Sequence, residues 1–163
     1  MKLITITTLI LFSLQATAQN KPLSLTTSQL SVKQIDSLAA SIDTTNGLRT
    51  AITDGYQTPK GKRKPKTSFS DTYYAKPATL QLCKVEHGES LLIEYFYFYN
   101  DSLVLVSTST WTKDGQVVQS GRYYFSNGVL FSKKEEGSPL SKPEAFLQHA
   151  ALYLKDVKTM FIN

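Results

Sequence analysis

The stretch that decides the fold is LLIEYFYFYNDSLVLVSTSTWTKDGQVVQSGRYYFSNGVLFSKKEE, residues 91–136. It divides into four segments rich in β-branched and aromatic residues, 91–99, 103–112, 117–126 and 129–136, which short polar turns separate. The turn at Asn127-Gly128 is the strongest hairpin signal, because both residues tolerate positive φ. Parallel strands need a crossover of about a dozen residues or more, and these turns are far shorter. The stretch therefore predicts an antiparallel meander.

Two further strands are expected before this stretch. One is short, at 72–75, and a clearer one covers 79–86 and ends at a polar hairpin tip, His87-Gly88-Glu89. The segment 91–99 is apolar on both faces apart from Glu94, which is typical of a central strand covered on both sides. The expected sheet has about five strands.

Helices are predicted on both sides of the sheet segment. Ser31 and Gln34 fit a capping box, and apolar residues follow at helical spacing until Asn46-Gly47 ends the pattern. Ser141 and Glu144 form a second capping-box pattern before an apolar stripe that runs to Phe161. The sequence thus predicts an α+β fold: an N-terminal helix, an antiparallel meander sheet and a C-terminal helix packed on that sheet.

The first eighteen residues have the layout of a secretory signal peptide. A basic Met1-Lys2 precedes a twelve-residue apolar run, 3–14, and an Ala-Thr-Ala junction ends at Ala18. A membrane-spanning helix needs roughly 20 apolar residues, so cleavage after Ala18 and release of a soluble protein into the periplasm or beyond are expected. No second apolar stretch predicts a membrane span in the mature chain.

The domain organisation follows from these segments. Residues 1–18 are the signal peptide, and 19–70 hold the N-terminal helix and an irregular basic segment rich in Pro and Gly. Residues 71–163 hold the sheet and the C-terminal helix, and we expect them to form one domain with 28–52.

The positive charge of the chain is concentrated in one segment. The net charge is +5, and the run 60–66 contains five basic residues and no acidic one. Outside this run and the signal peptide, acidic residues slightly outnumber basic ones, which argues against a broad nucleic-acid-binding face. The polyanion-binding candidates are Lys60, Lys62, Arg63, Lys64 and Lys66. The alternative is a solvated loop without a binding role.

Catalytic and metal-binding signals are weak. Cys83 is the only cysteine, so no intramolecular disulfide can form. The sequence contains no Gly-x-Ser-x-Gly, no His-Glu-x-x-His and no phosphate-binding glycine loop, so no catalytic residue, metal ligand or cofactor is predicted. The tip formed by Glu86, His87 and Glu89 is the one candidate for acid–base chemistry, and a solvated turn is its simpler interpretation.

Aromatic residues of the strands are the other candidate site. Tyr and Trp combine apolar area with a polar group, so a sheet face that gathers them can bind a partner or a small apolar ligand. If the strands alternate regularly, these side chains share one face: Tyr95, Tyr97, Tyr99, Trp111 and Tyr123. The simpler interpretation is that they belong to the core.

A weak internal repeat links two of the hairpins. Residues 97–103 (YFYNDSL) resemble residues 124–130 (YFSNGVL) at an offset of 27. The segment 122–130 also resembles a hairpin of the MORN-type and related antitoxin-like bacterial repeats, which consist of an aromatic strand, an Asn-Gly turn and a return strand. The resemblance covers two hairpins, and the first copy has Asp101-Ser102 where the second has a glycine. It implies the hairpin architecture and carries over no functional residue.

From these observations we expect an exported bacterial-type protein that acts as a non-enzymatic binding or interaction domain of the cell envelope. One alternative is a small hydrolase that uses the tip at Glu86, His87 and Glu89. The other is polyanion binding through the run 60–66. The identity of the partner and the oligomeric state do not follow from the sequence.

Overall fold

A computed structural model describes residues 30–57, 67–137 and 142–161 of the 163-residue chain. In these residues two helices enclose one antiparallel sheet. The elements in chain order are α1 (Val32–Thr44), β1 (Arg49–Gln57), β2 (Thr67–Ala75), β3 (Leu82–Glu89), β4 (Leu92–Tyr99), β5 (Ser102–Trp111), β6 (Val117–Ser126), β7 (Val129–Glu136) and α2 (Pro143–Met160).

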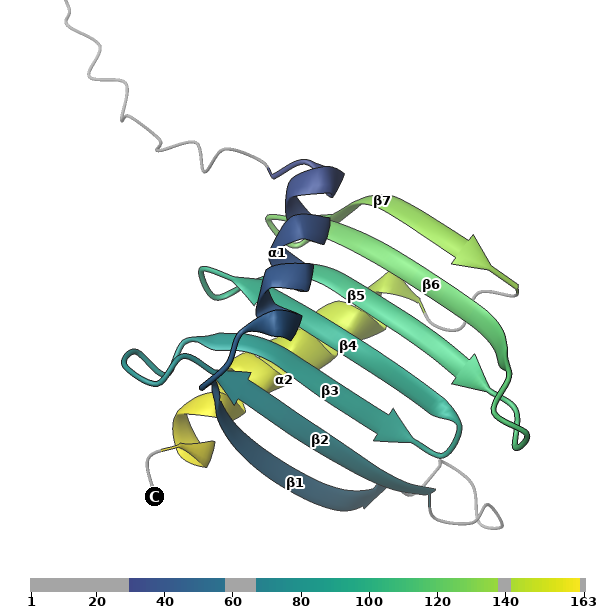
Figure 1. The fold of residues 1–163 in the computed structure, drawn as a ribbon, viewed down its shortest axis with the longest axis horizontal. Helices are drawn as coiled ribbons and strands as arrows, with labels where there is room; N and C mark the ends of the chain where they lie inside the picture. Colours follow the sequence, from purple (N-terminus) through teal and green to yellow (C-terminus); the bar gives the residue numbers. More distant parts are fainter. Residues whose placement is uncertain (1–29, 58–66, 138–141, 162–163) are drawn as a thin grey trace, which may run out of the picture.

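The sheet is a meander of seven strands in the order β1-β2-β3-β4-β5-β6-β7. Figure 1 shows α1 crossing one face of the sheet and α2 lying on the opposite face, and both helices run across the strands. The predicted α+β class, with a helix at each end and an antiparallel meander between them, is confirmed. The expectation of about five strands is too low by two.

The differences lie beside the segment that the sequence marks as irregular: β1 is an additional strand, and β2 begins five residues before the short strand expected at 72–75. β1 extends to Gln57 and β2 begins at Thr67, and the two pair in register from Arg49↔Ala75 to Gln57↔Thr67. Polar residues and Gly55 hide the strand pattern here, because β1 is an edge strand with little burial to impose alternation. β3 likewise continues through Glu89, so the predicted tip at 87–89 is wrong and the turn lies at Ser90, where φ is +55°.

The two copies of the 27-residue repeat have the same backbone geometry. Both turns have positive φ at their two central residues, 48° and 56° at Asn100-Asp101 and 50° and 73° at Asn127-Gly128, as two-residue hairpins require. Each hairpin also has a register shift at an equivalent position, between Tyr97 and Phe98 in β4 and between Tyr124 and Phe125 in β6. The two hairpins therefore share both their turn geometry and their β-bulge.

The helix termini agree with the sequence in one case and differ in the other. Ser31 and Gln34 form the predicted capping box at the start of α1. The capping box predicted for α2 is wrong, because the helix begins at Pro143 with Lys142 as a cap that makes no side-chain bond. Glu144 is then the second helical residue, one position too early to close such a box, and Ser141 lies outside the described residues.

Each helix covers its own hydrophobic cluster. The larger one lies under α2 and joins Phe146 and Tyr153 to strand residues such as Tyr73, Phe96 and Tyr123. The smaller one lies under α1, and its buried members are Ile35, Ala39, Tyr97, Val104, Leu105 and Tyr124. Strand β4 contributes to both clusters, so it is the doubly covered central strand that the sequence predicts.

Gly121 of β6 is expected to be essential for the packing under α2. A Cβ at this position would lie 2.7 Å from Cε2 of Tyr123, whose ring is only 1% exposed. We expect Gly121→Ala to lower the free energy of unfolding by about 1–3 kcal/mol, as overpacking does. Gly88→Ala is the matched control, because its nearest neighbour would be the Ser70 carbonyl at 3.8 Å. Urea denaturation of both variants tests this, and equal stabilities would contradict it.

Candidate functional site

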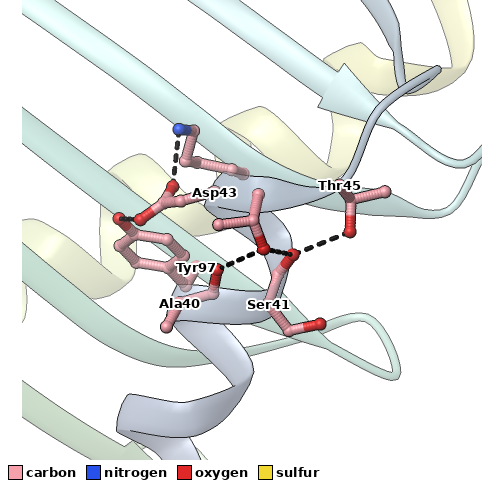
Figure 2. A network of polar contacts seen from close by, with 7 residues as sticks. Ala40, Ser41, Asp43, Thr45 and Tyr97 are labelled. Atoms are coloured by element: carbon pink, nitrogen blue, oxygen red, sulfur yellow. Dashed lines mark hydrogen bonds and ion pairs between the residues drawn. The ribbon is translucent and has the colours of Figure 1, made fainter.

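Asp43 holds the C-terminal end of α1 on the sheet. Nζ of Lys84 in β3 lies 2.8 Å from its Oδ1, and the hydroxyl of Tyr97 in β4 donates to its Oδ2 at 2.9 Å (Figure 2). Burial raises the pKa of Tyr97, and so does the hydrogen bond to Asp43, so the hydroxyl stays protonated. The hydroxyl of Thr45 donates to the Ser41 carbonyl at 2.7 Å and closes the last turn (Figure 2).

Asp36 makes the equivalent contact two helical turns earlier. Its Oδ1 accepts hydrogen bonds from Nη2 of Arg122 at 2.8 Å and from the hydroxyl of Tyr124 at 3.0 Å. Both donors come from β6, and Nε of Arg122 also donates to the Tyr124 hydroxyl at 3.2 Å. Burial raises the pKa of Tyr124, as does its hydrogen bond to Asp36, although Arg122 lowers it in part. Each aspartate is thus paired with one tyrosine and one cation.

The two tyrosines occupy equivalent positions of the 27-residue repeat. Tyr97 and Tyr124 both flank the β-bulge of their hairpin. Tyr97 lies opposite Leu105 in its return strand, and Tyr124 lies opposite Ser132, the repeat equivalent of Leu105. Sequence reasoning missed Tyr124 as a partner of α1. The repeat was the signal that could have found it, since it aligns Tyr124 with Tyr97.

A pocket of about 300 Å³ lies between α1 and the sheet, between these two contacts. It exists because small side chains face each other across the interface, Ala39 and Ala40 on the helix and Ser107 on β5. The remaining lining residues are Asp36, Asp43, Tyr97 and Arg122. The wall is therefore mostly polar, with carboxylate, guanidinium and hydroxyl groups around a floor of alanine.

The sheet beside this pocket is only partly covered. One row of residues lies directly opposite one another on successive strands, and all four are half-buried: Glu86, Tyr95, Ser107 and Arg122. The next row outward contains Gly88, Ile93, Ser109 and Ser120, which are half-buried as well. We call these two rows the open face. It carries three serine hydroxyl groups and the tyrosine ring of Tyr95.

The predicted aromatic residues do not share one face. Tyr95 and Tyr97 lie on the α1 side, whereas Tyr123 is buried under α2. The cause is the register between β5 and β6, which pairs Ser107 with Arg122 and so puts even-numbered residues of β6 on the α1 side. Tyr99 is 42% exposed, and the indole N–H of Trp111 donates to Ser109 at 3.0 Å. Tyr95 is half-buried and lies opposite Ser107, a lining residue of the pocket.

His87 is buried in the sheet rather than placed at a solvated tip. Its Nδ1–H donates to Oδ1 of Asp71 in β2 at 2.6 Å, and the hydroxyl of Tyr153 in α2 donates to the same oxygen at 3.3 Å. Glu94 lies opposite His87 on β4, and the exposed fractions of Asp71, His87 and Glu94 are 6%, 4% and 3%. The three residues form a polar row that α2 covers. Glu86 points to the other face, so the predicted Glu86–His87–Glu89 group is divided.

Burial and neighbouring charges shift the pKa values of the polar row. Burial by itself lowers the pKa of His87, but Asp71, Glu94 and Glu89 outweigh it and raise the pKa above its ordinary value. Burial raises the pKa of Glu94 to about 6, although His87 opposes this. Burial lowers the pKa of His149 in α2, as does nearby His87. This arrangement favours a protonated His87 paired with Asp71 beside a carboxyl group that resists ionisation.

Several predicted features lie outside the described residues. They are the signal peptide 1–18 and the candidates Lys60, Lys62, Arg63, Lys64 and Lys66. Within the described residues, no three His, Cys, Asp or Glu side chains are grouped so as to hold a metal ion. Neither described helix is long and apolar enough to cross a membrane.

Comparison with known proteins gives no relative from which a role could be transferred. No protein-family model, curated protein or solved structure matches the chain. The resemblance to MORN-type and antitoxin-like hairpins therefore stays a prediction, and the site is interpreted from its own geometry.

The tyrosine hydroxyls are expected to hold α1 on the sheet. We expect Tyr97→Phe and Tyr124→Phe each to lower the free energy of unfolding by about 1 kcal/mol, the net value of a typical hydrogen bond. Amide hydrogen exchange in α1 should become faster in both variants. Tyr153→Phe is the control, because it removes a hydroxyl bond on the other face. Unchanged exchange in α1 of the double variant would show that the hydroxyls do not hold the helix.

Glu94 is expected to make stability depend on pH. Its pKa of about 6 in the folded protein exceeds the ordinary 4.5, so folding is favoured with the proton bound. The free energy of unfolding should therefore fall as pH rises between these values. Glu94→Gln removes this loss and should be more stable than the parent by about 2 kcal/mol near pH 8, with no gain near pH 4.

Denaturation at several pH values measures this gain. Glu89→Gln is the matched control, since that side chain lies 4.0 Å from His87 but is 26% exposed and should change stability by about 0.5 kcal/mol or less. A gain for Glu94→Gln that does not depend on pH would contradict the assignment.

Proposed function

We propose that this protein is a non-enzymatic binding domain that holds a small ligand in the pocket between α1 and the sheet. The observation that carries the proposal is the pocket of about 300 Å³, whose polar walls come from α1, β4, β5 and β6. Ligand sites are concave and have a few converging polar groups, and this volume is at the lower end of their range. The polar wall favours a polar ligand over the small apolar ligand that the aromatic strands suggested.

The position of the pocket supports this role. Two of its lining residues, Ser107 and Arg122, also belong to the half-buried open face, so the pocket adjoins a part of the sheet that a ligand can reach. Its walls are held by the ion pairs and tyrosine hydrogen bonds of Asp36 and Asp43, so the site is formed before a ligand arrives. A preformed site avoids the entropic cost of ordering side chains on binding.

The buried polar row supports a binding role more than a hydrolytic one. A general base must come within hydrogen-bond reach of its substrate, and His87 is 4% exposed beneath α2. We therefore prefer binding to the hydrolase alternative. Polyanion binding through residues 60–66 stays a separate proposal. So does export to the cell envelope, which depends on the pattern of residues 1–18.

Filling the pocket should abolish binding. Ser107→Trp places a large ring in the pocket, whereas Ser120→Trp puts the same ring on the open face outside the lining residues. We expect some members of a library of small polar metabolites to raise the Tm of the parent protein and of Ser120→Trp, but not of Ser107→Trp. A ligand at about 100 times its Kd stabilises by about 2.7 kcal/mol, which a thermal-shift assay resolves.

His87→Ala tests the alternative in parallel. Under the binding proposal, hits that depend on Ser107 should survive this substitution. The proposal would be contradicted if no compound of the library bound the parent protein in a way that Ser107→Trp abolishes. Hydrolysis of a library ester or glycoside that His87→Ala abolishes would favour the hydrolase instead.

A further inference from the structure

We propose that the pocket between α1 and the sheet accepts one ring of a neutral carbohydrate. The proposal rests on the binding function above and names the class of its ligand. It is based on the charge balance of the pocket, on its hydrogen-bonding groups and on the position of Tyr95.

Each charged residue that lines the pocket has a partner of opposite charge. Asp36 pairs with Arg122 and Asp43 with Lys84, and each pair has an N–O distance of 2.8 Å. A charged ligand would lie close to the member of one pair that has the same charge. It would also lose its hydration without an unpaired opposite charge to compensate, which is costly. A neutral ligand avoids this cost. The pocket therefore discriminates by hydrogen bonding rather than by net charge.

The hydrogen-bonding groups of the pocket suit vicinal hydroxyls. A carboxylate offers about four acceptor sites, so Asp36 and Asp43 keep free lone pairs after their contacts with the sheet. The guanidinium of Arg122 has five N–H groups and uses two of its nitrogens here, Nε and Nη2. Ser107 adds a hydroxyl that both donates and accepts. Sugar hydroxyls also do both, and adjacent ones can bridge a carboxylate and a guanidinium.

Tyr95 supplies the apolar surface that a sugar ring needs on its C–H side. It is half-buried and lies directly opposite Ser107, which lines the pocket. Nζ of Lys84, which pairs with Asp43, lies over one face of the ring at 5.4 Å from its centre, so a sugar would stack on the other face. The ring is a broad apolar face with a polar tip. Further units of a saccharide chain would extend from the pocket past Tyr95 toward Ile93, its neighbour on the open face.

Isothermal titration with neutral sugars and their charged derivatives tests the proposal. The probes are glucose, galactose and N-acetylglucosamine with their disaccharides, and glucuronate and glucosamine as the charged counterparts. We expect at least one neutral sugar to bind and its charged counterpart to bind at least tenfold more weakly. Ser107→Trp should abolish binding and Tyr95→Leu should weaken it at least tenfold, whereas Tyr99→Leu, a tyrosine of the same strand, should leave Kd within twofold.

Tyr95→Phe keeps the ring and should retain affinity within threefold, so the role of the ring remains testable if Tyr95→Leu does not fold. Tighter binding of the charged counterparts would overturn the proposal. If no sugar binds while other compounds still bind in a way that Ser107→Trp abolishes, the carbohydrate assignment fails and the binding function stands. If no compound of any class depends on Ser107, both fail.

Discussion

The structure depends on a match between two spacings. Asp36 and Asp43 are seven residues apart on α1, which corresponds to about 10.5 Å along a helix axis. Their tyrosine partners come from β4 and β6, two strands apart in the sheet, or about 9.6 Å. Because α1 crosses the strands (Figure 1), these lengths lie along the same direction, and each aspartate reaches its own tyrosine. One helix and one sheet repeat thereby fix each other's position.

The same match accounts for the pocket. Between the two contacts the helix passes over β5, and the residues that meet there, Ala39, Ala40 and Ser107, are too small to fill the gap. The ion pairs of Asp36 and Asp43 are partly exposed and so contribute little stability by themselves. Their larger effect is to satisfy tyrosine hydroxyls that are buried at one end and to orient polar groups around an open space. The contacts that dock the helix therefore also build the candidate site.

The two faces of the sheet differ in what their polar groups do. Under α1, polar groups surround a pocket that solvent can reach. Under α2, the Asp71–His87–Glu94 row is enclosed by aromatic side chains, and burial raises the pKa of Glu94 to about 6 because ionisation there is costly. Buried networks of this kind can fix a register, since shifting one strand would leave its partners unsatisfied. We regard the α2 face as the structural side and the α1 face as the binding side.

Much of the fold could be predicted because its signals are local. Ser31 caps the first helix with its own side chain, and the Asn127-Gly128 turn joins adjacent strands through its backbone preference. The turns between the strands of 91–136 are so short that they can connect only antiparallel neighbours, which gives a meander. The edge strand β1 is harder to predict, because an exposed strand needs no alternation of apolar residues, and residues 48–52 alone fit a turn as well as a short strand.

Which residues meet was decided by the tertiary structure alone. Regular alternation assigns Tyr123 to the face of Tyr97, yet the pairing of β5 with β6 puts Tyr124 there instead. Likewise, the sequence around His87 is typical of a polar turn, but the pairing of β3 with β2 continues past it and places His87 in the sheet opposite Asp71. Moving the register by a single residue exchanges the faces of every side chain in a strand. The sequence determined the elements and their order, whereas register and helix docking determined the pocket, because both depend on contacts between residues far apart in the chain.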